Sequence, residues 1–437
     1  MTLRIEGGTV VTLDKENRIL NPGAVVVEGK KIKDIGSLSN IKQKYSTADV
    51  LDATGKVIMP SFVNTHHHFY STFARGWAPS GPTSNFNQVL ENMWWKLDDA
   101  LFRKSIYYSA LVPLIESVKC GVTSIIDHHE SQSYQIGSLE EISRAVEEIG
   151  VRAVLCLGTS DRFGKGEPGI AENERFLRKD FDRIKGMVGL HASFTVNQET
   201  LERSVNLANK FNAGIHVHAA EDISDQKVTK EKYGQSVIER FNSVGALNEK
   251  SLLVHCIHID KSEREIIKNS GASVAHNPES NMNNAVGYSK ILDMYNEGLD
   301  VGIGTDGMSS DVRRQARTAF LLARHQYKDP EAAFMEVPDM LLNNNPKILE
   351  KITDWNNSKL EVGADADIVS IDYNPATPIT KENFLGHFLF GMGDYSVDST
   401  ICDGNILMRH KKIPGVKESE IFARARETAQ KVWENIE

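Results

Sequence analysis

The sequence predicts an α/β fold, a (β/α)8 TIM barrel with a composite β-sandwich domain built from both termini. Three observations lead to this prediction. Short apolar stretches alternate with amphipathic helical stretches through the middle of the chain, strand-like stretches return near the C-terminus, and histidines gather where the central strands end. The chain has 437 residues, enough for a barrel of roughly 250 residues and one accessory domain.

The two ends of the chain predict the sandwich. Residues 1–55 hold short strand-like stretches separated by glycines and by Asn21-Pro22-Gly23, a pattern typical of small all-β units. Residues 359–415 contain further strand-like stretches and are expected to complete the same sandwich. Residues 416–437 have the periodicity of a single amphipathic helix.

Between these parts, residues 56–358 predict the barrel. Apolar strands followed by helical segments are the pattern of parallel βαβ units. Eight such units favour a closed barrel over an open, doubly wound sheet, which is the alternative. The predicted strands cover residues 57–68, 122–129, 152–158, 187–193, 213–219, 251–258, 272–278 and 300–307.

Composition and charge argue against several classes of protein. A net charge of −9 gives no basic surface for nucleic acid or for an anionic membrane. The sequence shows neither a signal-peptide pattern nor an apolar run of roughly 18 residues, so it predicts no membrane partner. The four cysteines are widely spaced, with no Cys-x-x-Cys pair, which predicts reduced thiols and a cytoplasmic location.

Eleven of the 14 histidines lie at or near the C-terminal ends of predicted strands. A single histidine is usually a hydrogen-bonded core residue, so it is their convergence that carries the prediction. In a barrel these strand ends form one mouth, where active sites are found. His66 and His68 are two residues apart in a strand, so both imidazoles point to the same face.

His218 ends the fifth predicted strand, and Asp306 ends the eighth, which neighbours the first in a closed barrel. We therefore expect His66, His68, His218 and Asp306 to bind a divalent metal ion. Imidazole nitrogens with one carboxylate suit Zn²⁺, or Fe²⁺ as the alternative, better than ions that prefer only oxygen ligands.

Two further residues are predicted to act in catalysis together with Asp306. Glu221 follows His218 by three residues and is placed to carry a proton from metal-activated water to a substrate nitrogen. The alternative for Glu221 is a solvated loop acid. His255 ends the sixth strand and is expected to polarise the attacking oxygen or a substrate carbonyl.

Substrate contacts are expected from several elements around the mouth. His191 lies in the fourth strand, and Asn281 closes a polar segment after the seventh. His216 is either a packing or hydrogen-bonding residue behind the site or a functional one, with no preference between the two. The loop with Asp161 and Arg162 is another candidate rim.

Residues 69–104 follow the first strand and are expected to cover the mouth. This segment holds an arginine and aromatic residues suited to a flat ring: Arg75, Trp77, Phe86, Trp94 and Trp95. Arg75 is the predicted substrate-binding residue among them. The alternative places Trp94 and Trp95 in the core or in a dimer interface.

Five segments resemble the amidohydrolase superfamily: residues 60–76, 214–222, 252–260, 275–287 and 302–311. Within it they resemble the aminohydrolases that include guanine deaminase, 8-oxoguanine deaminase and the triazine hydrolases. The resemblance is greatest to the SsnA-type aminohydrolases, which are associated with selenium-dependent purine metabolism. It implies the same barrel and composite sandwich that the strand pattern predicts.

The resemblance also implies roles for individual residues. It places the metal ligands on His66, His68, His218 and Asp306, the acid–base residue on Glu221, the strand-six histidine on His255 and a substrate-binding histidine on His191. Binuclear members bridge two metals through a modified lysine on strand four. Residues 187–193 contain no lysine, which implies one metal ion. Ser61 replaces a glycine usual in the family, at the strand start away from the mouth.

The sequence therefore predicts a metal-dependent aminohydrolase, or deaminase. It would cleave a non-peptide C–N bond of a purine-like nitrogen heterocycle through a metal-activated hydroxide. One alternative is a cyclic amide or imide hydrolase, or a chlorohydrolase, with the same site. The other is a catalytically silent metal- or purine-binding protein. The expected partner is a small heterocyclic substrate, and a homodimer is among the oligomeric states left open.

Overall fold

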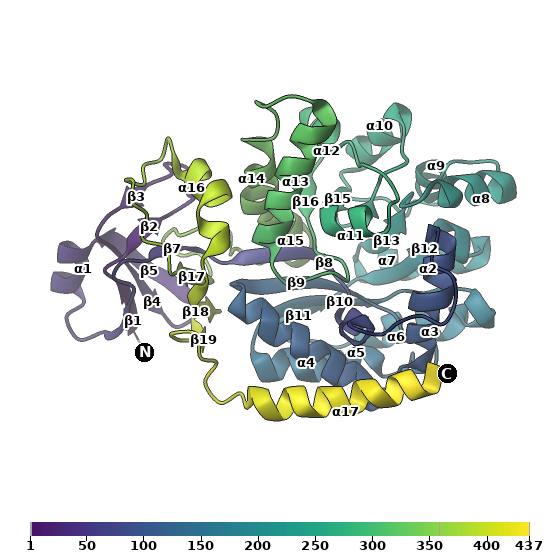
Figure 1. Ribbon diagram of the computed structural model, residues 1–437, viewed down its shortest axis with the longest axis horizontal. Helices are drawn as coiled ribbons and strands as arrows, with labels where there is room; N and C mark the ends of the chain where they lie inside the picture. Colours follow the sequence, from purple (N-terminus) through teal and green to yellow (C-terminus); the bar gives the residue numbers. More distant parts are fainter. Residues whose placement is uncertain (1, 358, 437) are drawn as a thin grey trace.

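The computed structural model describes residues 2–357 and 359–436, which form a β-sandwich beside a ring of parallel strands covered by helices (Figure 1). Within these residues no helix is both long enough and apolar enough to cross a membrane. The two termini lie far apart in the view of Figure 1, and the last helix runs back along the barrel.

Two sheets form the sandwich. The first has the order β5 (Lys31–Ser37), β4 (Gly23–Glu28), β1 (Thr2–Glu6) and β6 (Asp49–Asp52), with α1 (Leu38–Lys44) after β5. The second has the order β19 (Asn405–Met408), β18 (Val397–Cys402), β17 (Ile368–Ile371), β7 (Val57–Pro60), β2 (Thr9–Val11) and β3 (Ile19–Leu20). A shared apolar core that includes Ile5, Ile58 and Ile368 fills the space between them. The sandwich is thus built from both ends of the chain, as the sequence predicts.

The barrel begins later than the sequence predicts. Val57–Pro60, expected as the start of the first barrel strand, pairs instead with β17 and β2 in the sandwich. The chain changes sheets at Ser61, and the backbone N–H of Phe62 donates to the carbonyl of Gly121 in the barrel wall, at 3.0 Å or less. One continuous apolar run serves both sheets, so hydrophobic periodicity does not mark this change of hydrogen-bond partner.

Eight parallel strands form the barrel ring. They are β8 (Phe62–His67), β9 (Val122–His129), β10 (Arg152–Leu157), β12 (Val188–Ala192), β13 (Ile215–Ala219), β14 (Leu252–His255), β15 (Ser273–His276) and β16 (Val301–Ile303). The short strand β11 (Ile184–Gly186) pairs in parallel with β10. Parallel bridges join His67 to Asp306 and Thr159 to Leu190, and these bridges connect the two sheets into one ring.

Helices surround the ring on its outer side (Figure 1). In chain order they are α4 (Arg103–Lys119), α5 (Ser138–Ile149), α6 (Gly166–Leu177), α7 (Gln198–Phe211), α8 (Ile223–Tyr233), α9 (Val237–Ser243), α10 (Lys261–Ser270), α11 (Pro278–Asn283), α12 (Ile291–Asn296), α13 (Val312–Tyr327), α14 (Glu336–Asp339) and α15 (Asn345–Thr353). Capping side chains start several of them: Asp260 accepts from the N–H of Glu263 at the start of α10, and Gly271, with φ of 75°, ends that helix.

Two further segments complete the chain. The chain passes from β8 to α4 through four short helical elements. They are the 3-10 helix η1 (Phe69–Ala74), α2 (Phe86–Val89), the π-helical turn η2 (Leu90–Trp94) and α3 (Trp95–Ala100). After the sandwich helix α16 (Phe384–Phe390), the long helix α17 (Glu418–Ile436) packs against α3 and α4. Trp433 of α17 donates its Nε1–H to the carbonyl of Phe73, 2.7 Å away, so the C-terminal helix holds the segment that follows the first histidines.

Candidate active site

The structure brings the four predicted metal ligands together at the C-terminal ends of the barrel strands. The Nε2 atom of His68 lies 3.1 Å from both Nε2 of His218 and Oδ1 of Asp306. The Nε2 atom of His66 lies 3.7 Å from the same carboxylate oxygen. All four side chains are buried. Ligand atoms of His66, His68 and His218 lie within 4.8 Å of one another, and those of His66, His255 and Asp306 do so as well.

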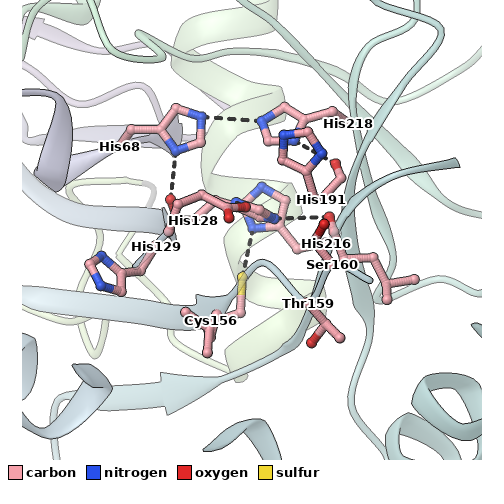
Figure 2. Close-up of polar contacts among 12 residues, drawn as sticks. His68, His128, His129, Cys156, Thr159, Ser160, His191, His216 and His218 are labelled. Carbon is pink, nitrogen blue, oxygen red and sulfur yellow. Dashed lines mark hydrogen bonds and ion pairs between the residues drawn. The ribbon is translucent and has the colours of Figure 1, made fainter. Parts of the chain in front are cut away.

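Backbone carbonyls determine which nitrogens of this cluster face inward. The Nδ1 atom of His68 lies 2.5 Å from the carbonyl of His128, and Nδ1 of His218 lies 2.7 Å from that of His191 (Figure 2). A carbonyl only accepts, so each Nδ1 carries hydrogen. A neutral ring then presents an Nε2 lone pair, and these two lone pairs face each other at 3.1 Å. That arrangement is favourable only when a cation, or a proton on one of the two nitrogens, lies between them.

The electrostatics of the cluster also favour positive charge. Burial opposes ionisation of Asp306, yet its interactions with the neighbouring His66 and His68 rings hold the pKa of its carboxyl well below the usual range. Burial lowers the pKa of His68, but its hydrogen bond to Asp306 and the charge of that carboxylate together raise it to about 9. Burial and repulsion from His68 lower the pKa of His218 to about 3. Without a metal, a proton on His68 supplies the positive charge.

Unpartnered nitrogens complete the case for a metal ion. Within the described part of the chain, Nε2 of His66 and Nε2 of His255 are buried without a hydrogen-bond partner. Buried polar atoms are rarely left in this state unless a ligand or ion satisfies them. Three imidazole nitrogens and a carboxylate are a donor set that Zn²⁺ and Fe²⁺ both accept. The residues present therefore fit a divalent cation.

A chain of acid–base groups lies beside the cluster. Nε2 of His255 lies 3.4 Å from Oε2 of Glu221 and 3.6 Å from Oδ2 of Asp306. Burial raises the pKa of the Glu221 carboxyl, to which the charge of Asp306 adds. Asn284 donates to Oε1 of Glu221 over 3.3 Å. Glu221 is therefore a largely buried carboxyl, 13% exposed, beside the histidine cluster, which is the position that a proton carrier needs.

Backbone strain holds several of these groups in place. Ala220, His255, Cys256 and Asp306 have positive φ angles of 49°, 71°, 48° and 52°. Residues other than glycine rarely adopt this region, and each costs on the order of 1 kcal/mol or more. Such strain concentrates at functional sites, where the surrounding fold over-determines the backbone.

The other predicted site residues have different outcomes. His191 lines the pocket above the cluster. Asn281 does not line the pocket, and its Oδ1 instead accepts from Nδ1 of His255 over 2.7 Å, so it orients the His255 ring from behind. Arg75 lies outside the pocket as well, and both of its terminal nitrogens pair with Glu116 of α4 at 2.6 and 2.8 Å. The structure gives no support to the substrate contacts predicted for Arg75 and Asn281.

An open pocket of about 780 Å³ leads to the cluster. One wall is apolar and aromatic and is formed by Tyr70, Phe86, Leu90, Trp94, Trp95 and Phe194. The segment after the first strand thus contributes to the site. Trp94 and Trp95 line the pocket, whereas the sequence alone did not decide between a place at the pocket and a place in the core or a dimer interface. Aromatic faces of this kind suit a flat ring.

Sequence reasoning missed an acidic group at the far side of the pocket. Asp98 and Glu130 both line it, and Nη2 of Arg162 lies 2.8 Å from Oδ2 of Asp98 and 3.4 Å from Oε2 of Glu130. Burial raises the pKa of Asp98 to about 7 and that of Glu130 to about 8, although the charge of Arg162 opposes both shifts. Glu130 directly follows a strand-end histidine, which was an available signal, whereas Asp98 lies in a helical segment without one.

The family model described as Amidohydrolase family matches residues 57–407. The chain belongs to the amidohydrolase family. The superfamily resemblance of the sequence is thus confirmed, while the narrower likeness to the SsnA type stays a prediction. This amidohydrolase is a hydrolase that acts on C–N bonds other than peptide bonds.

Two relatives match the amidohydrolase along nearly its full length. The 5'-deoxyadenosine deaminase of Methanobrevibacter smithii is 33% identical and covers 97% of this chain and 98% of its own. The 5-methylthioadenosine/S-adenosylhomocysteine deaminase of Desulforudis audaxviator is 30% identical over 95% of this chain and 96% of its own. The solved adenosine deaminase of Xanthomonas campestris, with bound zinc, has a TM-score of 0.87 and 21% identity over 98% of both chains, which confirms the predicted fold.

We predict that the affinity of this amidohydrolase for Zn²⁺ depends steeply on pH. Because the pKa of His68 is raised to about 9, metal binding must displace its proton. The apparent affinity should rise about tenfold per pH unit up to about pH 9 and then level off. Chelator competition at a series of pH values measures this. An affinity that stays constant between about pH 7 and about pH 9 would contradict the account of the His68–Asp306 pair.

Proposed function

We propose that the protein deaminates an adenosine-type nucleoside whose 5' position carries no anionic group, with release of ammonia. The observation that carries this proposal is the placement of Glu221, His255 and Asp306 beside three inward-facing histidines, at the end of a pocket with an aromatic wall. The relatives named as deaminases of 5'-deoxyadenosine and 5-methylthioadenosine support the choice of substrate class.

We propose His66, His68, His218 and Asp306 as ligands of one divalent ion, Zn²⁺ or alternatively Fe²⁺. When bound, such an ion supplies the Lewis acidity that activates water and polarises the reacting carbon. The rest of the chemistry falls to residues of the chain. Water adds to the ring carbon, the exocyclic amine leaves as ammonia, and the purine keeps a carbonyl in its place.

Glu221 is proposed to move the first proton. Its carboxylate takes a proton from the attacking water and delivers it to the neighbouring ring nitrogen, which ends the aromaticity that holds the amine in place. A carboxyl with a raised pKa is suited to both steps, because it is a stronger base than an ordinary carboxylate when it takes the proton and still releases that proton to the ring. The amide of Asn284, which donates to Oε1, keeps the side chain directed at the site.

His255 and Asp306 are proposed to complete the transfer. Nε2 of His255 lies between the carboxylates of Glu221 and Asp306, at 3.4 and 3.6 Å, and so orients the attacking oxygen. Asp306 passes the second proton to the departing amine. Asn281 fixes the ring of His255 through Nδ1, which keeps Nε2 directed at the reacting atoms.

The far side of the pocket suits a ribose. Oδ1 of Asp98 and Oε1 of Glu130 are buried and have no hydrogen-bond partner within the described residues, so they offer two acceptors to two neighbouring hydroxyl groups. His191 is a third candidate contact, because its Nδ1 lies 2.8 Å from the hydroxyl of Thr195 and its other nitrogen is left for substrate. Trp94 and Trp95 line the same pocket and offer an aromatic surface for the base.

We also propose that the reaction takes place in the cytoplasm. The four cysteines are free thiols, and three of them are buried, which agrees with a reducing compartment. The homodimer that the sequence leaves open stays a prediction.

Replacing Glu221 by glutamine should lower turnover of 5'-deoxyadenosine by about 10²–10⁴-fold, because an amide of the same shape cannot carry a proton. Ammonia release measures turnover, and metal content should stay at the wild-type level. Glu231→Gln is the matched control, since Glu231 is exposed on α8. Equal turnover by wild type and Glu221→Gln would remove Glu221 from the mechanism.

The charge of the pocket predicts discrimination between nucleosides and nucleotides. Among the described residues that line it, none is lysine or arginine, whereas Asp98, Glu130, Glu221, Asp222, Asp225 and Asp306 all do so. We expect kcat/KM for 5'-deoxyadenosine to exceed that for adenosine 5'-monophosphate by at least about 100-fold, because an anion would be desolvated beside carboxylates, and the nearby Arg162 is already paired with Asp98 and Glu130. Comparable values for the two substrates would show that the acidic side of the pocket does not meet the 5' group.

A further inference from the structure

Behind the metal cluster, a line of polar groups runs through the otherwise apolar barrel interior. His216 lies two residues before His218 in β13, and its Nε2 is 3.0 Å from Nδ1 of His66. Its other nitrogen, Nδ1, is 3.5 Å from Sγ of Cys156 in β10 (Figure 2). Sγ of Cys156 in turn lies 3.7 Å from the carbonyl of Asp127 in β9. All of these side chains are fully buried.

Hydrogen counting leaves two arrangements for this line. A neutral imidazole has one N–H donor and one acceptor nitrogen. If Nε2 of His216 carries the hydrogen, Nδ1 of His66 must accept it, and the hydrogen of His66 then occupies Nε2. Nε2 is the atom that faces Asp306 at 3.7 Å, so in this arrangement His66 has no lone pair to offer a cation.

The opposite arrangement frees the ligand. If Nδ1 of His216 carries the hydrogen, it donates to Sγ of Cys156, and Nε2 of His216 accepts from Nδ1 of His66. The lone pair of His66 then lies on Nε2 and points into the cluster. The thiol hydrogen of Cys156 still has an acceptor, the carbonyl of Asp127. Every donor in the line is thus satisfied in the only arrangement that lets a neutral His66 bind a cation.

We propose that Cys156 and His216 are positioning residues that determine which nitrogen of His66 carries hydrogen and thereby tune the affinity of the site for its metal ion. The proposal rests on the metal-binding role proposed for His66. It also separates His66 from the other two histidine ligands. Backbone carbonyls orient His68 and His218, and a backbone carbonyl remains in place when the side chain of its residue is substituted. His66 depends instead on the side chains of His216 and Cys156, which substitution can remove.

Packing alone does not account for a thiol at this position. Cys156 belongs to an apolar cluster with Val63, Ile126 and Val154, where packing needs apolar volume but no hydrogen-bonding group. Without Sγ, the N–H of His216 would have no acceptor in a dry interior, a loss that favours the arrangement that blocks His66. Cys156 is therefore expected to act through hydrogen bonding, which makes its role separable from packing.

The test is the Zn²⁺ affinity of the full-length protein, measured by chelator competition. Cys156→Ala is expected to weaken binding about 10-fold, as for other groups that orient metal ligands. Cys156→Ser keeps a hydroxyl that can both accept from His216 and donate to Asp127, and it should bind within about threefold of wild type. Val154→Ala is the matched control on the same strand face, and it should lower stability without changing affinity.

A double-variant cycle separates this role from a structural one. His216→Phe should weaken Zn²⁺ binding by about 10–100-fold, and in that background Cys156→Ala should have no further effect, because nothing remains to donate to Sγ. Wild-type affinity in Cys156→Ala, or an undiminished effect in the His216→Phe background, would overturn the proposal. Failure of the wild-type protein itself to bind one Zn²⁺ per chain would instead overturn the proposed metal site.

Discussion

The carbonyls of His128 and His191 hold the Nδ1 hydrogens of His68 and His218, and the rest of the site follows from this constraint. The two rings then turn their Nε2 lone pairs toward each other, and Nε2 of His68 also lies 3.1 Å from Oδ1 of Asp306. Two lone pairs and a carboxylate in a buried space repel one another unless positive charge joins them. A barrel whose strand ends deliver both the rings and their carbonyl partners thus requires a cation at its mouth.

Charge is distributed along the pocket in a way that suits one orientation of substrate. Glu221, His255 and Asp306 line the pocket beside the histidine cluster, and Asp98 and Glu130, which pair with Arg162, line it as well. Trp94 and Trp95 line the same pocket. A nucleoside placed with its amine at the cluster directs its sugar hydroxyls to the acids and its ring to the tryptophans. Strained backbone at His255 and Asp306 keeps the catalytic groups from relaxing away from that arrangement.

Much of the fold and of the metal cluster was predictable because strand geometry is regular. His66 and His68 share a face through the period of two, and strand ends converge in a barrel, so His218 and Asp306 follow from their positions. Other residues depend on contacts with no sequence signal. Arg75 forms an ion pair with Glu116, and Asn281 accepts a hydrogen bond from His255. Asp98 lines the pocket from a position on a helix. The change from the sandwich sheet to the barrel sheet at Ser61 could not be predicted, because one continuous apolar run contributes to both sheets.

The most direct test of the central claim is a crystal structure of the Zn²⁺-loaded protein, with anomalous scattering at the zinc edge to locate the ion. The account predicts one peak per chain, at about 2.0–2.2 Å from Nε2 of His66, His68 and His218 and from a carboxylate oxygen of Asp306. A peak bound elsewhere, or coordination through Nδ1 of His68 or His218, would contradict it, because the carbonyls would then not be what orients the rings.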